Sequence, residues 1–319
     1  MKFDIIIGNP PYQESNGAGQ SGGTPLFDKF IVKSLDISNR CVCMIFPSKW
    51  MAGTQGNMVT LREKLTEGNH IKRIVDYMDA SIIFPGTSIA GGVQYLMYDN
   101  EYVGDTDFTT VLDKEYNSKR SLITEDGLIP RHDVGQSVIE KIKEFKEQSL
   151  SVVIYKDKWG IPTDFVGNTN RQETDNVSIY TPRGWYHDEY YGTYLNSSKD
   201  YKVMFGRIIT EHAAEPSKNN NYTILSSLNV LKPFEICNAS YMVVDGISKE
   251  EYAQNIISYL KTKFVRFLIL QTLFGIGLTP DRFRFIPIQD FSKSWTDIEL
   301  YEKYKLDEHE IKFIEKIIK

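Results

Sequence analysis

The chain has 319 residues, of which 41% are hydrophobic and 13% are aromatic, and its formal net charge is −5. This length allows about two folded domains, and the apolar content excludes an intrinsically disordered chain. The acidic balance excludes a protein that is basic over its whole surface, although a basic cleft for nucleic acid can still lie in an acidic protein.

The numbers and spacings of cysteine and histidine indicate the redox compartment and whether a metal site is expected. The three cysteines, Cys41, Cys43 and Cys237, form no Cys-x-x-Cys pair and no even disulfide framework, which favours a reducing cytoplasm. Cys41 and Cys43 are two apart in a predicted strand, so we expect them to share one face as small core residues. The five histidines form no His-x-x-x-His pair, and we predict no metal site. No signal peptide or membrane-length apolar run is visible, so we expect a cytoplasmic protein without a membrane partner.

Strands and helices alternate over the first third of the chain. Apolar, β-branched runs predict strands at 3–7, 41–46, 71–77 and 91–98. Apolar residues at helical spacing predict helices over 26–35 and 57–67. This alternation is typical of a doubly wound α/β sheet, in which ligands bind beyond the carboxyl ends of the strands.

The first predicted strand, 3–7, runs through a glycine directly into Asn9-Pro10-Pro11-Tyr12. An Asn side-chain oxygen and a backbone carbonyl can accept hydrogen bonds from both N–H groups of a planar amine. Two prolines restrict the backbone of such a turn, and a tyrosine ring offers a surface on which a base can stack. The alternative is an ordinary Pro-rich turn after a strand.

This strand and tetrapeptide resemble the catalytic motif of amino-directed S-adenosylmethionine (SAM) methyltransferases, in particular the N6-adenine DNA enzymes. The resemblance implies that Asn9 and the Pro10 carbonyl hold the amine of a flipped adenine. It implies that Pro11 holds the turn in extended geometry and that Tyr12 stacks on the base.

Two segments near the motif carry weaker expectations. The resemblance implies that an aromatic residue at the position of Phe84 packs against the flipped base; the alternative is an ordinary buried phenylalanine. Residues 13–24 are polar and rich in glycine, which predicts a mobile loop beside the site, ordered by DNA or cofactor. They lack the Lys-Ser or Lys-Thr of a phosphate-binding loop.

The pattern changes after residue 125. A helix is predicted over 135–148, and the segment 151–247 has short strand-like pieces rich in Asn, Gly and Tyr. Several aromatic residues gather there among basic ones: Trp159, Trp185, Tyr186, Tyr190, Tyr191 and Tyr194. A helix over 249–274, with Ser248 as its N-cap, and a closing helix over 307–318 follow.

The resemblance assigns this second region to target recognition, through aromatic and basic contacts to DNA. The candidates for phosphate or base contact are Arg171, Arg183, Lys202 and Arg207. The alternative for each aromatic residue is the core of an irregular domain. Acidic and basic residues balance over this region, so a basic face does not follow from the sequence.

We therefore expect a partial doubly wound α/β methyltransferase sheet followed by an irregular α+β target-recognition domain. The expected division is a catalytic half at 1–125, a connecting helix at 126–150, a target-recognition domain at 151–290 and a helical tail at 291–319. The ending Phe285-Ile286-Pro287 with Trp295-Thr296-Asp297 resembles the C-terminal part of bifunctional type II (type IIG-like) restriction–modification methylases.

In the family that the chain resembles, the glycine loop and the acidic residue that bind SAM precede the Asn-Pro-Pro-Tyr strand, so we assign no cofactor-binding residue. Phe274-Gly275-Ile276-Gly277 follows a helix rather than a strand and is not taken as such a loop. The expected function is adenine-N6 methylation of double-stranded DNA in a restriction–modification system, with SAM as donor. A SAM-binding subunit or a missing N-terminal half is the expected partner.

Two alternatives remain open. The chain is a non-catalytic or split-enzyme DNA-binding specificity subunit, or it is a methyltransferase that acts on a protein glutamine or an RNA base. No restriction-nuclease motif stands out, so cleavage is not carried over from the bifunctional relatives.

Overall fold

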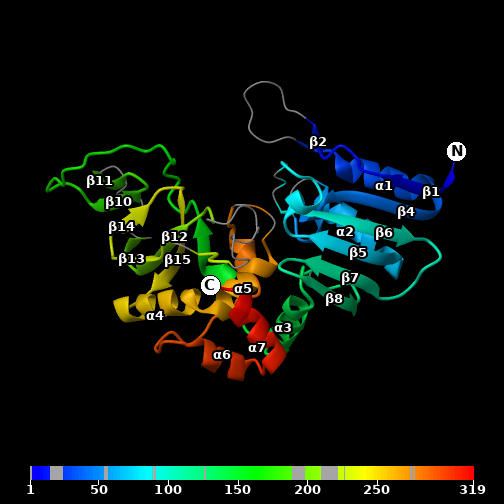
Figure 1. Cartoon of the computed structure of the whole chain (residues 1–319). Coiled ribbons are helices and arrows are strands. Elements are labelled where there is room, and N and C mark those ends of the chain that lie inside the picture. The colour runs from blue at the N-terminus through cyan, green and yellow to red at the C-terminus, as the bar shows by residue number, and fades with distance from the viewer. Residues whose placement is uncertain are drawn as a thin grey trace. The chain divides into compact units, whose positions relative to one another are not determined.

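The computed structural model describes residues 2–14, 24–53, 57–87, 89, 91–125, 127–188, 198–209, 222–225, 227–273, 275 and 277–319. These residues form two compact units (Figure 1). The first contains Met1–Ser137 and Gln271–Gly275, and the second contains Val138–Thr210, Tyr222–Leu270 and Ile276–Lys319. The division falls inside the helix α3 (Asp133–Glu144), and the C-terminal helices cluster with the rest of the second unit.

The first unit is built on a six-stranded mixed sheet with the order β1-β4-β6-β5-β7-β8. The strands are β1 (Phe3–Gly8), β4 (Ser38–Pro47), β5 (Ile71–Tyr77), β6 (Val93–Asp99), β7 (Thr106–Val111) and β8 (Glu115–Arg120). The pairs β1–β4 and β5–β7 are parallel, and β6 and β8 run antiparallel to their neighbours. The predicted α/β class and the four predicted strands are confirmed.

Two helices cover one face of this sheet. In α1 (Phe27–Ile37), Phe27 stacks on Phe46 of β4, with 5.7 Å between the ring centroids. In α2 (Met58–Thr66), the side chain of Leu61 is fully buried. Both helices have apolar residues at helical spacing, which places one stripe against the sheet and the charged residues outside.

The second unit contains two smaller sheets. An antiparallel sheet has the order β13-β12-β15-β9, and a mixed sheet has the order β11-β10-β14. Their strands are β9 (Ile154–Lys156), β10 (Val177–Thr181), β11 (Gly184–Asp188), β12 (Tyr201–Gly206), β13 (Asn229–Leu231), β14 (Glu235–Cys237) and β15 (Tyr241–Ile247). Buried residues of these strands and of the segment between β9 and β10, including Trp159, Ile179 and Met204, form one core.

The long helix predicted over 249–274 is two helices, α4 (Glu250–Lys261) and α5 (Lys263–Gln271), so the single-helix prediction is wrong. The chain is extended at Thr262, whose hydroxyl donates to the Tyr259 carbonyl (2.7 Å) and accepts from the backbone N–H of Val265 (3.2 Å). The hydroxyl therefore ends one helix and caps the next.

Two short helices, α6 (Asp297–Lys303) and α7 (Glu308–Ile317), close the chain. Each begins with a capping box, formed by Thr296 with Glu299 and by Asp307 with Glu310. None of the described helices combines the length and the apolar character that crossing a bilayer requires.

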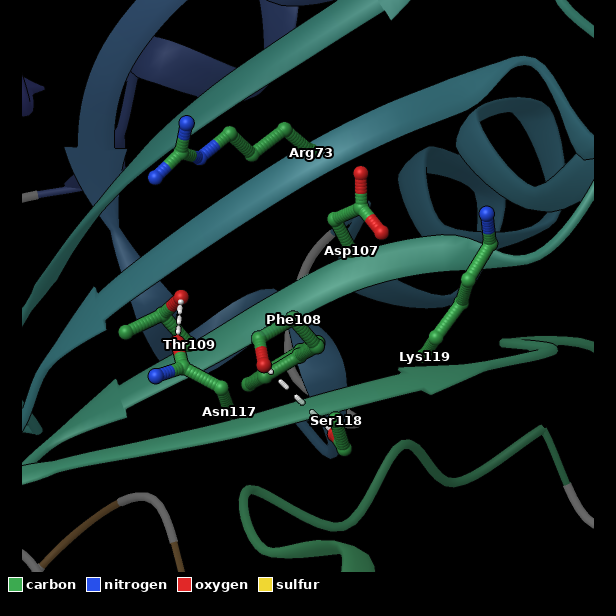
Figure 2. A pocket seen from close by; sticks show the side chains of 7 residues that line it. All are labelled: Arg73, Asp107, Phe108, Thr109, Asn117, Ser118 and Lys119. Atoms are coloured by element: carbon green, nitrogen blue, oxygen red, sulfur yellow. Dashed lines mark hydrogen bonds between the residues drawn. The ribbon is translucent and has the colours of Figure 1, made fainter.

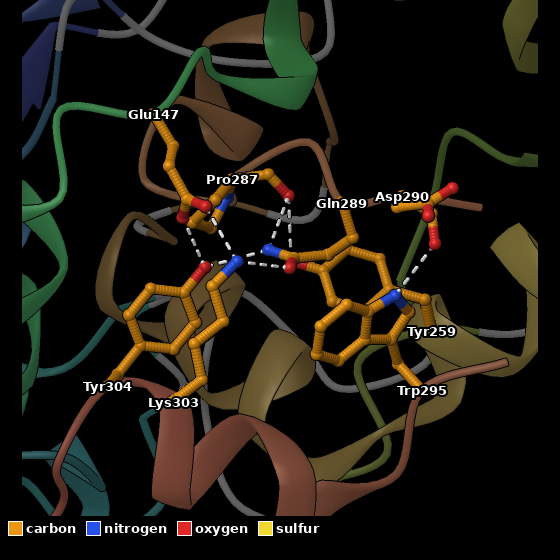
Figure 3. Close-up of polar contacts among 8 residues, drawn as sticks. All are labelled: Glu147, Tyr259, Pro287, Gln289, Asp290, Trp295, Lys303 and Tyr304. Atoms are coloured by element: carbon orange, nitrogen blue, oxygen red, sulfur yellow. Dashed lines mark hydrogen bonds and ion pairs between the residues drawn. The ribbon is translucent and has the colours of Figure 1, made fainter. Parts of the chain in front are cut away.

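A partly buried polar network joins α6 to the segment after α3 (Figure 3). The Lys303 ammonium donates to the Glu147 carboxylate and to the Gln289 side-chain oxygen, at 2.6 Å each. The Tyr304 hydroxyl donates to Glu147 (2.5 Å) and accepts from the Gln289 amide (2.7 Å). Because each of these side chains has a hydrogen-bond partner, we interpret the network as stabilising the fold and not as a reactive site.

Candidate functional site

The Asn-Pro-Pro-Tyr turn lies at the carboxyl end of β1, at one edge of the six-stranded sheet (Figure 1). The ladder between Ile5–Gly8 and Cys41–Met44 holds the chain before the turn. A two-residue pairing of β2 (Gln13–Glu14) with β3 (Thr24–Pro25) holds it after the turn. The turn is therefore anchored on both sides, which is the preorganisation that a positioning site needs.

Within the turn, the four side chains differ in exposure. Asn9 and Pro11 are exposed, Pro10 is buried and Tyr12 is half-buried. The Asn9 side chain is exposed, and its amide forms no hydrogen bond to another described residue. The Tyr12 carbonyl accepts from the Leu26 N–H (3.1 Å), and burial raises the pKa of the Tyr12 hydroxyl to about 12. Tyr12 is therefore neutral at physiological pH and presents a ring rather than a charge.

A buried ionic network lies at the same end of the sheet as the turn, where β4 and β5 also end. Asp76, near the end of β5, accepts two hydrogen bonds from Arg131 (2.5 and 2.6 Å) and one from the Ser48 hydroxyl (2.6 Å). Arg131 also donates to the Gly91 carbonyl (2.9 Å). This network joins the carboxyl ends of β4 and β5 to the start of β6. Sequence reasoning missed it, because Asp76 and Arg131 are 55 residues apart and no local spacing relates them.

One glycine in this region is required by close approach. Gly92 has a φ of +74°, and a β-carbon there would collide with the carbonyl oxygen of Tyr77 and lie 2.9 Å from that of Met78. Only glycine fits both the left-handed backbone and the contact. The carbonyl of Gly92 accepts from the Ser48 N–H (3.2 Å), which ties the loop after β4 to the start of β6.

Phe84 lies on the loop after β5. Because β1 and β5 run in the same direction, this loop and Asn9 both follow the carboxyl ends of their strands. The Phe84 N–H donates to the carbonyl of Ala80 (2.9 Å), the first residue of the short helix η3 (Ala80–Ile82), and the Phe84 side chain is half-buried. Since β4 and β6 lie between β1 and β5, about 14 Å separate the two strand axes. The role of Phe84 against a base stays a prediction, because the structure places no contact between it and Asn9.

The four basic candidates lie in the second unit and differ in availability. Arg171 and Arg183 are exposed, and Arg183 is in the turn between β10 and β11. Arg207 is half-buried and donates to the Ala239 carbonyl (2.5 Å). Lys202 is fully buried, and its ammonium donates to the carbonyls of Ser198 (3.0 Å) and Asp200 (2.6 Å).

Burial lowers the pKa of Lys202 to about 8, with Lys158 adding to the effect. A phosphate group has no access to this side chain, so we withdraw Lys202 from the candidate DNA contacts. In the sequence, Lys202 is not distinguished from the other basic residues of this region. Lys202 points inward from β12, and the register of the sheet decides which side chains of β12 point inward.

Several predicted features lie outside the described residues. These are the central part of the Gly-rich loop at 15–23, the aromatic residues Tyr190, Tyr191 and Tyr194, and Phe274 and Ile276. Trp185 is described; it is 39% exposed beside Arg183, and its ring lies 5.0 Å from that of Tyr180. In the part of the chain that the structure describes, no group of three His, Cys, Asp or Glu side chains is placed to hold a metal ion.

Among solved structures, the chain is similar to two restriction–modification enzymes. The match to the type IIG restriction endonuclease BpuSI has a TM-score of 0.38 and 11% identity, covering 95% of this chain and 49% of that chain. The match to the type IIL enzyme MmeI, in complex with DNA, has a TM-score of 0.47 and 10% identity, covering 88% and 45%. Both TM-scores lie below 0.5, so the fold rests on the strand order rather than on these likenesses.

The sequence comparisons give matches of higher identity than the structural ones. The chain is 36% identical over 163 residues to an uncharacterized adenine-specific methylase of Mycoplasma pneumoniae, covering 47% of this chain and 39% of that protein. The chain thus spans well under two thirds of the length of this curated relative. Residues 1–84, which contain the Asn9–Tyr12 turn, match the family model of the Eco57I restriction-modification methylase. By these comparisons, residues 1–84 are similar to the Eco57I restriction-modification methylase family, and about half of the chain is similar to an adenine-specific methylase.

Proposed function

We propose that this chain carries the catalytic turn and the target-recognition part of an adenine-N6 DNA methyltransferase of a restriction–modification system. The observation that carries the proposal is the exposed Asn9 amide at the carboxyl end of β1, in a turn anchored before and after by strand pairing. The methyl donor of the proposed reaction is SAM. A cytoplasmic location belongs to the same proposal, because both DNA and SAM are found there.

The proposed roles follow from the chemistry of the amine. The lone pair of the adenine N6 is delocalised into the ring, so the amine is a poor nucleophile. The Asn9 side-chain oxygen and the Pro10 carbonyl would accept from its two N–H groups and draw the nitrogen toward tetrahedral geometry. Pro11 would keep Pro10 extended, and the neutral Tyr12 ring would stack on the base after it leaves the duplex.

The described residues do not assemble a SAM pocket around this turn. β1 is an edge strand, and none of the described strands lies on its outer side. We therefore assign no SAM ligand in this chain and derive no step that involves the cofactor. In the proposal, the residues of the Asn9–Tyr12 turn bind and orient the base.

The second unit would hold the duplex. Arg183, at the turn of the β10–β11 hairpin, and the neighbouring Trp185 form an exposed tip that suits contact with a groove or with the backbone. Arg171 and Arg207 are further candidates. If Arg183 contacts a phosphate, Arg183→Ala weakens duplex binding and lowers the slope of log affinity against log salt by about 1. An unchanged slope removes Arg183 from the interface.

The proposal is tested by incubating the purified chain with radiolabelled SAM and mixed-sequence duplex DNA, with and without a SAM-binding partner. We expect label on adenine N6, lost in Asn9→Ala and kept in Asn39→Ala. Asn39 is an exposed asparagine of the same unit whose amide donates to the Asp4 side chain (3.1 Å). Activity that persists in Asn9→Ala would refute the assigned role.

The outcome also separates the two alternatives. Duplex binding without label under either condition supports a non-catalytic specificity subunit. Label on a glutamine side chain or an RNA base, with none on DNA, supports the other substrate classes.

A further inference from the structure

A second short element lies beside the Asn9–Tyr12 turn. The helix η1 (Ser48–Met51) directly follows β4, and β4 is the parallel neighbour of β1. Segments that follow adjacent parallel strands leave the sheet at the same end, next to each other. Lys49 of η1 is therefore a basic residue at the end of the sheet where Asn9 stands.

The Lys49 side chain extends toward the segment that is hydrogen-bonded to the turn. Its ammonium lies 5.4 Å from the centre of the Phe27 ring, and Phe27 is the first residue of α1. The residue before it, Leu26, donates its N–H to the Tyr12 carbonyl (3.1 Å). The ammonium thus lies over the residue that directly follows the one bonded to Tyr12.

The Lys49 ammonium has an acidic neighbour but is not bonded to it. No hydrogen bond or ion pair joins the ammonium to another residue that the structure describes. Burial lowers the pKa of this half-buried group, and the charge of Asp28 opposes the effect. Asp28 is buried; one oxygen of its carboxylate accepts from the Asn57 amide (3.0 Å), and the other has no hydrogen-bond partner among the described residues. The carboxylate therefore attracts the ammonium toward the start of α1 and leaves its N–H groups available to an anion.

This arrangement favours a phosphate. A half-buried cation has lost part of its hydration, and hydrogen bonds to an anion replace what burial removed. An ammonium is a compact point charge with three N–H donors, which suits a phosphate group. A nucleotide that leaves the duplex rotates about its backbone, so its phosphates stay beside the pocket that receives its base. The anion nearest to a base held by Asn9 is therefore a phosphate of the same strand.

We propose that the Lys49 ammonium binds a DNA phosphate that flanks the flipped nucleotide, and that the Asp28 carboxylate positions this ammonium. This role rests on the proposed function, because the flipped base is the one held at Asn9. A phosphate contact carries no sequence information, but it fixes the register of the strand. Lys49 would thereby place the target base against Asn9.

Other cations of the same sheet lie away from the turn (Figure 2). Arg73 and Lys119 are exposed on β5 and β8, and the strand register places Asp107 of β7 between them. They line an open groove of about 440 Å³ near the amino ends of β5 and β7. Asn9 follows the carboxyl end of β1, so Lys119 is a matched control for a general effect of positive charge on DNA binding.

The test uses the whole chain and a mixed-sequence duplex with one adenine opposite an abasic site, since an unpaired base leaves the stack at low cost. Affinity is measured by fluorescence anisotropy, with each phosphate that flanks this adenine replaced in turn by an uncharged methylphosphonate. We expect one replacement to weaken wild-type binding about 10-fold. The same replacement should leave the already weaker binding of Lys49→Met unchanged, and it should weaken Lys49→Arg and Lys119→Met as much as the wild type.

An equal loss for the wild type and Lys49→Met, or no loss at either phosphate, would overturn the proposal. A wild-type chain that does not bind the probe would overturn it as well. Lys49→Met should keep the wild-type urea midpoint, because the ammonium makes no hydrogen bond or ion pair with the described residues. Lys49→Gln, which keeps a polar end, takes its place if Lys49→Met does not fold.

The readout is binding and not methyl transfer, so the two proposals fail separately. A chain that shows the expected phosphate response but leaves adenine unlabelled refutes the proposed function and leaves the phosphate contact of Lys49 standing. Label on adenine N6 together with an equal loss for the wild type and Lys49→Met refutes the role of Lys49 and leaves the proposed function standing.

Discussion

The buried pair of Asp76 and Arg131 should contribute more to the stability of the first unit than any exposed ion pair. The side chains are 0% and 5% exposed, and two hydrogen bonds join them directly. Asp76→Asn removes the negative charge but keeps the shape, so the buried Arg131 guanidinium loses the carboxylate that it contacts through two hydrogen bonds. Breaking a buried pair in this way costs about 3–5 kcal/mol of unfolding free energy.

The control is Glu101→Gln, in the exposed pair of Arg40 and Glu101, which are 60% and 71% exposed with 3.4 Å between the charged atoms. An exposed pair contributes about 0–1 kcal/mol. With a urea dependence of about 2 kcal/mol per molar, Asp76→Asn should lower the midpoint by about 2 M and the control by less than about 0.5 M.

Unfolding is followed by tryptophan fluorescence and by hydrogen exchange of the β5 and β6 amides. Trp50 is fully buried in the first unit, and Trp159, Trp185 and Trp295 belong to the second. Exchange in β12 of the second unit should stay at the wild-type rate. Equal midpoints for Asp76→Asn and Glu101→Gln would refute the reasoning, because burial would then make no difference to the pair.

Two further predictions concern buried positions in each unit. Burial lowers the pKa of Lys202 from 10.5 to about 8, so between these pH values the unfolded chain binds more protons and stability rises with pH. Urea titrations from pH 7.5 to 10 should show that Lys202→Met flattens this rise in the free energy of unfolding relative to wild type. Equal slopes against pH for the variant and the wild type would contradict the assignment. Gly92→Ala should cost about 2–5 kcal/mol, because it combines a positive φ with a collision at Tyr77. Gly86→Ala, with a φ of +79° and open space around the β-carbon, should cost only about 1–2 kcal/mol. Equal thermal shifts for the two variants would remove the collision as a cause.

Local sequence was enough for four of the six strands of the large sheet, whereas β7 and β8 were not predicted. Strand 71–77 is found where the apolar pattern placed it, and β1 leads into the Asn9 turn as expected. Apolar alternation and a terminal glycine are short-range signals, and they act in the same few residues that form the element. The same kind of signal failed at Thr262, where one hydroxyl divides an otherwise continuous helical pattern.

Local sequence did not predict which side chains are exposed. Arg183 and Lys202 are equally basic in the sequence, but Arg183 stands in a hairpin turn and Lys202 points into the second unit. The pairing of Asp76 with Arg131 joins residues far apart in the chain. Both facts depend on which strands become neighbours and in what register.

By itself, the sequence determined which groups the Asn9–Tyr12 turn offers for the proposed chemistry, because an amide oxygen, two prolines and an aromatic ring stand within four consecutive residues. Only the tertiary structure decided that β1 is an edge strand and that Ile5 and Ile7 lie on an uncovered face. The physical reason is that burial belongs to the whole sheet: a strand of the same apolar sequence is a core strand or an exposed edge according to what pairs beside it.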